Sequence, residues 1–156
     1  MTYDQSAFLE ESNRIEGEEW DELPEGALLR AIWHIGRKIE PKDIKIIHEL
    51  HRYPFTSYHG GREPIKFGVW RTFDVRVGSW IAPPAIKVNP LMAIYCADWP
   101  KMNAWEAHVR FEKIHPFEDL NGRVGRLLWL IKALEEGYDY RIKFLQAFYY
   151  QTLKNI

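Results

Sequence analysis

Twelve consecutive residues, 115–126, bring together the side chains that could do chemistry in this chain, and they read HPFEDLNGRVGR. Pro116 separates the histidine from the rest, and an Asn-Gly pair leads into a helical pattern, so we expect a short loop that enters a helix N-terminus. The first amides of a helix lack intrahelical partners and lie at the positive end of its dipole, which favours a bound anion. The stretch therefore predicts an anion site directly after a histidine.

The spacing of the charged residues narrows the predicted anion to a polyphosphate. Asp119, Arg123 and Arg126 are four and three residues apart, so we expect them to share one helical face. Two arginines suit a polyphosphate, and one carboxylate suits Mg²⁺, which combines one or two carboxylates with phosphate oxygens. An imidazole, with an ordinary pKa of about 6.5, is a suitable general base. The pattern predicts phosphoryl or nucleotidyl transfer onto a nucleophile that His115 deprotonates.

Each of these residues also has a simpler interpretation when it is taken alone. His115 could merely end a helix, and the charged residues could form a surface ladder of ion pairs that contributes little energy. Asn121 and Gly122 could form an ordinary turn, and Phe117 is a core anchor in either case. Only the ordered set of twelve residues favours the functional interpretation.

The periodicity of the chain predicts a mainly α protein with a small β element that must position this set. Helices are expected at 5–14, from Pro24 to about Arg37, from Pro41 onward, from Pro90 through Tyr95, from about Asn103 to Ile114, from about Leu120 to Glu136, and from about Tyr140 to Leu153. Residues 69–81 are β-prone and alternate through Phe73, Val75 and Val77, and Pro83 and Pro84 then end the run. Two short strands or a hairpin fit this segment.

Length and composition exclude several classes of protein. The 156 residues suit one domain over 1–156, and 21 basic against 22 acidic residues provide no global basic field for nucleic acid. Cys96 is the single cysteine, so no intramolecular disulfide or cysteine-rich zinc site is expected. His48 and His51 have a spacing that can bind metal, but with no third ligand nearby we interpret them as structural. No membrane span or signal peptide is apparent, which predicts a cytoplasmic location without a membrane partner.

The twelve-residue stretch resembles the signature of the Fic family, HPFx[DE]GNGRxxR. The matching positions are His115, Pro116, Phe117, Asp119, Asn121, Gly122, Arg123 and Arg126, whereas Leu120 stands where the family usually has glycine. If the loop requires a positive φ at this position, a leucine is strained there. The resemblance implies a helical bundle around the signature with a β-hairpin flap, here at about 68–82.

The resemblance also implies an activity and roles for the residues. The activity would be that of a protein adenylyltransferase, which transfers AMP from Mg-ATP to a Tyr, Thr or Ser hydroxyl of a target protein or of itself. The implied roles are His115 as the base, Asp119 as the Mg²⁺ ligand, the amides around Asn121 and Gly122 as the anion hole, and Arg123 and Arg126 on the β- and γ-phosphates. An extended segment of the target would add as a strand beside Val75, Arg76 and Val77 of the flap.

A second segment, at residues 12–17, resembles the inhibitory motif [ST]xxxE[GN] of the same family. Ser12, Glu16 and Gly17 match it, and residues 1–17 would form an N-terminal inhibitory helix. The resemblance implies that Glu16 pairs with Arg126 and occupies the arginine meant for the γ-phosphate, since an arginine–carboxylate pair is bidentate. The chain is thus expected to be an autoinhibited member.

Several alternatives stay open at this point. The chain could be a non-catalytic nucleotide-binding module, for which Leu120 is the best argument. It could use another donor such as UTP or GTP, or remove AMP with Glu16 positioning a water. A homodimer contact through exposed aromatic residues is a further option.

Overall fold

The structure, a computed structural model, describes residues 38–51 and 66–136. In chain order its elements are α3 (Pro41–Leu50), β1 (Arg76–Val77), β2 (Trp80–Ile81), α4 (Ala85–Asp98), the 3₁₀ helix η2 (Trp99–Lys101), α5 (Ala104–Ile114) and α6 (Asn121–Glu135). The predicted mainly α class with a small β-hairpin is confirmed. The helices expected at 5–14, 24–37 and 140–153 lie outside the described residues. None of the helices within the described ranges is long and apolar enough to cross a membrane.

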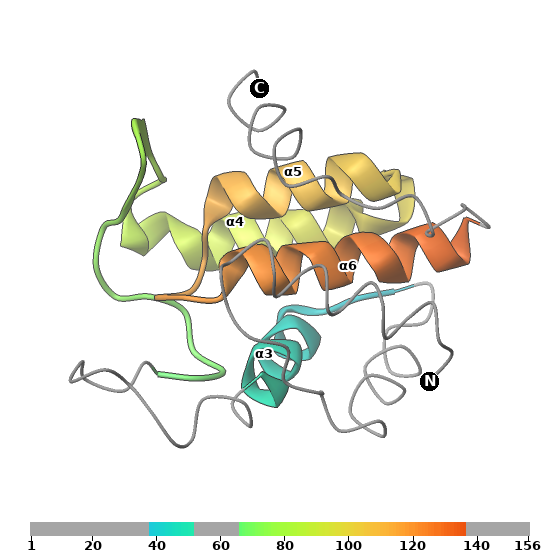
Figure 1. Cartoon of the computed structure of the whole chain (residues 1–156), viewed down its shortest axis with the longest axis horizontal. Coiled ribbons are helices and arrows are strands. Elements are labelled where there is room, and N and C mark those ends of the chain that lie inside the picture. Colours follow the sequence, from blue (N-terminus) through green and yellow to red (C-terminus); the bar gives the residue numbers. More distant parts are fainter. Residues whose placement is uncertain (1–37, 52–65, 137–156) are drawn as a thin grey trace.

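Four helices form the body of the described structure (Figure 1). The helices α4, α5 and α6 lie alongside one another, and α3 packs against α4 and α6 from below in this view. The helix α6 is buried on nearly all sides, and its buried residues include two arginines and a lysine. Buried cations of this kind need backbone or side-chain partners, so α6 is the helix on which polar function can be sought.

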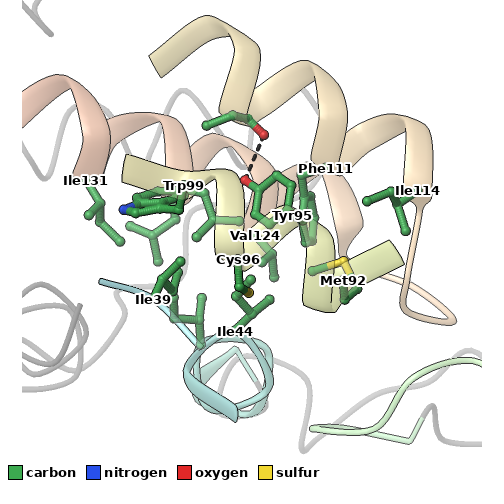
Figure 2. Close-up of a cluster of buried hydrophobic side chains, with 14 of the residues drawn as sticks. Ile39, Ile44, Met92, Tyr95, Cys96, Trp99, Phe111, Ile114, Val124 and Ile131 are labelled. Carbon is green, nitrogen blue, oxygen red and sulfur yellow. Dashed lines mark hydrogen bonds between the residues drawn. The ribbon is translucent and has the colours of Figure 1, made fainter. Parts of the chain in front are cut away.

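The core lies between these helices and follows their 3.6-residue period. The buried positions of α5 are Ala104, Ala107, His108, Phe111 and Ile114. They recur every three or four residues, which is the spacing of one helical face. Figure 2 shows Phe111 beside Tyr95 of α4, whose hydroxyl donates a hydrogen bond to the carbonyl of Ala107 at 2.8 Å. This bond satisfies the one polar group that Tyr95 brings into the core.

The helices α5 and α6 approach each other closely at Gly125. A Cβ atom at this position would clash with the Glu112 side chain and lie 3.1 Å from Cδ1 of Phe111. Glycine therefore allows the two helices to pack tightly next to the loop that joins them.

The predicted hairpin is confirmed, but it is shorter than the β-prone run. Val77 pairs with Trp80, and the two-residue turn between them has Gly78 at φ 60°, which suits a type II′ hairpin. Ala82 N–H donates to the carbonyl of Val75 at 3.2 Å and extends the pairing by one bond. The hairpin stands away from the helices (Figure 1), and Val77 is 43% exposed. The alternating apolar residues therefore do not form a buried face.

The helix predicted from Pro90 through Tyr95 is wrong at its start, because α4 already begins at Ala85 and contains Pro90. Pro84 occupies the N-cap position without a side-chain cap of its own. The carboxylate of Asp74, from the stem of the hairpin, accepts the Ala85 N–H at 2.8 Å instead. The cap of α4 thus comes from another part of the fold. By contrast, the predicted bounds of α5 and α6 agree with the structure to within a residue.

Candidate active site

His115 ends α5 in a left-handed backbone conformation, with φ 50° and ψ 59°. Its amide donates to the carbonyl of Phe111 at 3.0 Å. A residue with a Cβ is disfavoured in this conformation by about 1–2 kcal/mol. Within the described ranges, only His115 and Leu120 among non-glycine residues have a positive φ, and they bracket the loop 116–119. Strain of this kind is concentrated at functional sites.

Phe117 and Asn121 fix the loop between these two residues. Phe117 is fully buried and belongs to the core, which confirms its interpretation as a core anchor. The Asn121 side chain accepts the Phe117 N–H and donates to the Phe117 carbonyl, both at 2.9 Å. The Asn121 side chain is therefore used to hold the loop, and an anion site at this position would have to use backbone amides.

The N-terminus of α6 presents such amides. Leu120 is the N-cap, with φ 68°, and its carbonyl accepts the first helical hydrogen bond from Val124 N–H at 3.0 Å. The amides of residues 121–123 precede this bond, as the first amides of any helix do. The positive φ that would strain a leucine is confirmed at Leu120, and its side chain is buried rather than exposed at the helix end.

The expectation that Asp119 shares a helical face with the two arginines is wrong. Asp119 is exposed in the loop before α6, and its Oδ1 accepts the Leu120 N–H at 2.7 Å. Arg123 and Arg126 lie on α6 and are 8% and 0% exposed. The left-handed Leu120 interrupts the helical path, so the spacing from residue 119 to residue 123 no longer places both on one face.

The two arginine charges act on the same region of the protein. Burial, with smaller contributions in the same direction from the charges of Arg123 and Arg126, lowers the pKa of His51 to about 4. Burial likewise lowers the pKa of His108 to about 4, with a smaller contribution in the same direction from Arg126. Both arginine side chains therefore lie on α6 near the end of α3 and near His108 of α5, although the net charge of the whole chain is −1.

His48 was not foreseen as part of this site. Its Nδ1 accepts the Gly68 N–H at 3.0 Å, so its Nε2 carries the proton and donates to the Asp119 carbonyl, also at 3.0 Å. Its ring stacks on Phe117 at 3.7 Å, and burial lowers its pKa to about 4. The structural interpretation of His48 is confirmed, but its spacing in the sequence could not show that it holds the backbone of the signature loop.

The hairpin is anchored beside the same loop. Arg71 N–H, at the base of the hairpin, donates to the carbonyl of Pro116 at 2.9 Å. Val75, Arg76 and Val77 lie further along the hairpin, away from the helices (Figure 1). The predicted inhibitory residues Ser12, Glu16 and Gly17 lie outside the described residues.

The residues present fit a magnesium ion that takes most of its ligands from a nucleotide. In the part of the chain that the structure describes, no three His, Cys, Asp or Glu side chains form a group that could hold a metal ion. Asp119 provides a single exposed carboxylate beside the first turn of α6. Mg²⁺ commonly uses one or two carboxylates together with phosphate oxygens, so this donor set is sufficient only when phosphates are bound.

The fold, the signature loop and the comparison with known families agree. Residues 39–131 match the model of the Fic/DOC family, and this chain belongs to that family. The match spans α3 to α6 and includes the whole signature, His115 to Arg126.

Relatives and solved structures extend this comparison. The chain is 35% identical over 123 residues to the protein named protein adenylyltransferase Fic of Drosophila willistoni, which covers 71% of this chain and 24% of that protein. It is 32% identical over 105 residues to the protein of the same name of Aedes aegypti, covering 61% and 20%. The chain thus spans about a quarter of the length of these curated relatives.

The solved structures show the same fold. A Fic family protein from Desulfovibrio desulfuricans G20 matches with a TM-score of 0.68 at 24% identity, over 97% of this chain and 56% of that one. A Fic domain containing signaling protein from Bacteroides thetaiotaomicron matches with a TM-score of 0.61 at 19% identity, over 96% and 70%.

Proposed function

We propose that this protein is an adenylyltransferase that transfers AMP from Mg-ATP to a Tyr, Thr or Ser hydroxyl of a target protein or of itself. One observation carries the proposal: His115 is held at the end of α5, one short loop before the first amides of α6 and its two buried arginines. A base, an anion site and arginines that can bind phosphates are the parts that nucleotidyl transfer requires. The names of the relatives support the same activity.

In the proposed reaction, a target hydroxyl attacks the α-phosphorus of ATP and His115 accepts the hydroxyl proton. A new oxygen–phosphorus bond forms, the bond to the β-phosphate oxygen breaks, and pyrophosphate leaves. The amides of residues 121–123, with Arg123 and Arg126, would bind the phosphates and stabilise the charge that develops. Asp119 would hold Mg²⁺ together with phosphate oxygens, and the bound ion would neutralise phosphate charge.

The hairpin is the proposed binding site for the target. Within the described residues β1 pairs only with β2, so its other edge can accept an extended peptide as a third strand. Val75, Arg76 and Val77 would supply this edge. Since the base of the hairpin bonds to Pro116, a bound segment would lie near the loop that carries His115.

We also propose that Glu16, in the motif Ser12 to Gly17, inhibits the enzyme by pairing with Arg126. The place of Arg126 on α6, one turn after Arg123, supports this, because a carboxylate paired with it would compete with a phosphate for the same guanidinium. The Glu16→Gly variant should transfer more label than the parent chain. Glu18→Gly is the matched control, since it removes a nearby carboxylate outside the motif and should change nothing.

The experiment that tests the activity measures label transferred from α-labelled ATP with Mg²⁺ in the Glu16→Gly variant. Adding His115→Ala should abolish transfer, whereas Arg110→Gln, at an exposed ion pair of α5, should leave it intact. Transfer that survives without His115 would contradict the assigned role. Parallel reactions with labelled UTP and GTP, and with a target already carrying AMP, separate the other donors and AMP removal from the proposed reaction.

One observation favours a second function, that of a nucleotide-binding module without turnover. Leu120 holds a left-handed conformation at the N-cap of α6, where a glycine would be unstrained. A loop of this kind could bind phosphates without aligning them for attack. The module is supported if ATP raises the Tm of the Glu16→Gly variant while no label is transferred to any protein, and it is excluded by label transfer that depends on His115.

A further inference from the structure

Arg71 is a buried arginine whose side chain binds only backbone carbonyls within the described residues. Its exposed fraction is 2%, although it lies in the segment that leads into the hairpin. Its Nε donates to the His115 carbonyl at 2.7 Å, and one Nη2 hydrogen bond reaches the Ile114 carbonyl at 3.2 Å. Its Nη1 donates to Phe73 at 3.0 Å, and Nη2 donates to Pro83 at 2.6 Å.

These four carbonyls belong to two parts of the protein. Two of them, of Ile114 and His115, are at the C-terminal end of α5, where backbone carbonyls lack intrahelical partners and the helix dipole is negative. The other two, of Phe73 and Pro83, come from the two stems of the hairpin. A guanidinium suits this position because it is planar, stays charged and presents five donors in a rigid fork, which a lysine cannot reproduce.

The hydrogen bond from the Arg71 side chain to the His115 carbonyl lies at a strained part of the backbone. Only two non-glycine residues in the described ranges have a positive φ, and Arg71 binds the carbonyl of one of them. The backbone N–H of Arg71 also donates to Pro116, the next residue of the loop, at 2.9 Å. Both the side chain and the backbone of Arg71 therefore hold the turn in which His115 lies.

We propose that Arg71 is a positioning residue that maintains the left-handed conformation of His115 and ties it to the stems of the hairpin. The proposal rests on the proposed function, in which His115 is the base. Arg71 would then anchor both the hairpin that binds a target strand and the imidazole that takes the proton of the target hydroxyl. Loss of the anchor should misplace the imidazole while the phosphate-binding end of α6 remains in place.

The first experiment needs no nucleotide. Hydrogen exchange of the His115 amide is measured in the parent chain, in Arg71→Gln and in Arg71→Lys, with the Ala107 amide near the start of α5 as internal reference. Both amides donate to helical carbonyls at 3.0 Å. We expect exchange at His115 to accelerate roughly ten-fold or more in Arg71→Gln, and less in Arg71→Lys, while Ala107 is unchanged. Equal exchange at His115 in all three proteins would overturn the proposal.

The second experiment measures label transfer in the Glu16→Gly background. Arg71→Gln should lower kcat roughly 10- to 100-fold and change the KM for ATP little, because a small misplacement of a reacting group costs rate rather than binding. Arg71→Lys, which keeps the charge, should recover part of kcat. The matched control is Arg110→Gln, on the same helix α5, where Arg110 pairs with Asp98 at 2.9 Å. It should change neither constant.

The two experiments separate the positioning role from the proposed function. If the Glu16→Gly parent transfers no AMP, the proposed function fails, and exchange at His115 still decides the role of Arg71. If Arg71→Gln does not fold, the hydrogen exchange and kcat of Arg71→Lys test the positioning role instead. A kcat equal to that of the parent in a folded Arg71→Gln protein, or a KM that rises as much as kcat falls, overturns the positioning role.

Discussion

Two buried cations, Lys132 and Arg71, bind carbonyls at the C-terminal ends of neighbouring helices, but their surroundings differ. Lys132 Nζ donates to the Trp99 carbonyl at 2.8 Å, lies 5.0 Å from the centre of the Trp99 ring and is 3.7 Å from the Glu135 carboxylate. Arg71 instead divides its donors among the end of α5 and the two hairpin stems. We call the first region, Trp99 with Lys132, the packed end, and the second, Arg71 with residues 114–123, the reactive end.

The contacts of the two cations indicate different roles. At the packed end, the Lys132 ammonium group binds the carbonyl at the end of one helix, lies over the Trp99 ring and has the Glu135 carboxylate beside it. Such an arrangement stabilises packing.

At the reactive end, two strained residues bracket a loop. The side chains of His48 and Asn121 bind this loop, and the Arg71 side chain binds the His115 carbonyl directly before it. We therefore expect changes at the packed end to lower stability and changes at the reactive end to lower activity.

The largest effect should come from His115→Asn. Asparagine tolerates the left-handed backbone but cannot act as the base, so the variant keeps the loop and removes the chemistry. We expect label transfer in the Glu16→Gly background to fall about 10²- to 10⁴-fold, with little change in Tm. A variant with full activity, or one that loses activity only because it unfolds, would remove the distinction between the two ends.

Acid should lower the stability of the fold through three buried histidines, His48, His51 and His108, which belong to neither of the two ends. Burial holds the pKa of each at about 4 in the folded protein, whereas an unfolded histidine titrates at about 6.5. Between these values the unfolded chain binds more protons, so the free energy of unfolding should fall as the pH drops from about 6.5 to about 4. The expected slope is up to about 1.4 kcal/mol per pH unit for each histidine.

Urea unfolding at pH 7, 6, 5 and 4 measures this slope. The His108→Gln variant should lose about a third of the part that these three histidines contribute. An identical slope in the parent and in His108→Gln would show that the acid sensitivity arises elsewhere.

A smaller effect should follow Lys132→Met, which tests the packed end. The Trp99 carbonyl would lose its donor in a buried place, at a cost of about 1–3 kcal/mol. We expect Tm to fall by several degrees while the transfer rate per folded molecule is unchanged. Lys101→Met is the matched control, because Lys101 is exposed on η2, and it should leave Tm unaltered. Lost activity at an unchanged Tm would reverse the roles assigned to the two ends.

The smallest effect should distinguish Leu120→Gly from Leu120→Ala. Both variants remove the same buried side chain, but only alanine must hold a Cβ at φ 68°. The glycine variant should therefore be the more stable by about 1 kcal/mol in chemical denaturation. At the exposed Ile94, inside α4, the order should reverse by about the same amount, because alanine is the better helix former. The same order at both positions would argue against strain at Leu120.

Much of the reactive end could be predicted because its signals are local. The bounds of α5 follow from Asn103, whose side chain accepts the Glu106 N–H at 2.8 Å, and from the proline after His115. The order of His115, Asp119, Arg123 and Arg126 along the chain is itself the signature. The hairpin was also foreseen, since a glycine within a β-prone run is a local turn signal.

What escaped prediction depends on residues far apart in the chain. The N-terminus of α4 is capped by Asp74, eleven residues before Ala85, so no local pattern indicates it. His48 and Asp119, which are 71 residues apart, meet only in the folded protein. The expected common face of Asp119 and the arginines was wrong because the backbone at Leu120 leaves the helical path.

The helical class, the position of the hairpin and the ordered set of reactive side chains follow from the sequence alone, because propensity, periodicity and capping act over a few residues. The burial of Arg123 and Arg126, the left-handed backbone of His115 and the hydrogen bond that Arg71 makes to it from 44 residues away became visible only in the folded protein. Burial and strained backbone are maintained by contacts between distant segments, and such contacts exist only once the chain has folded.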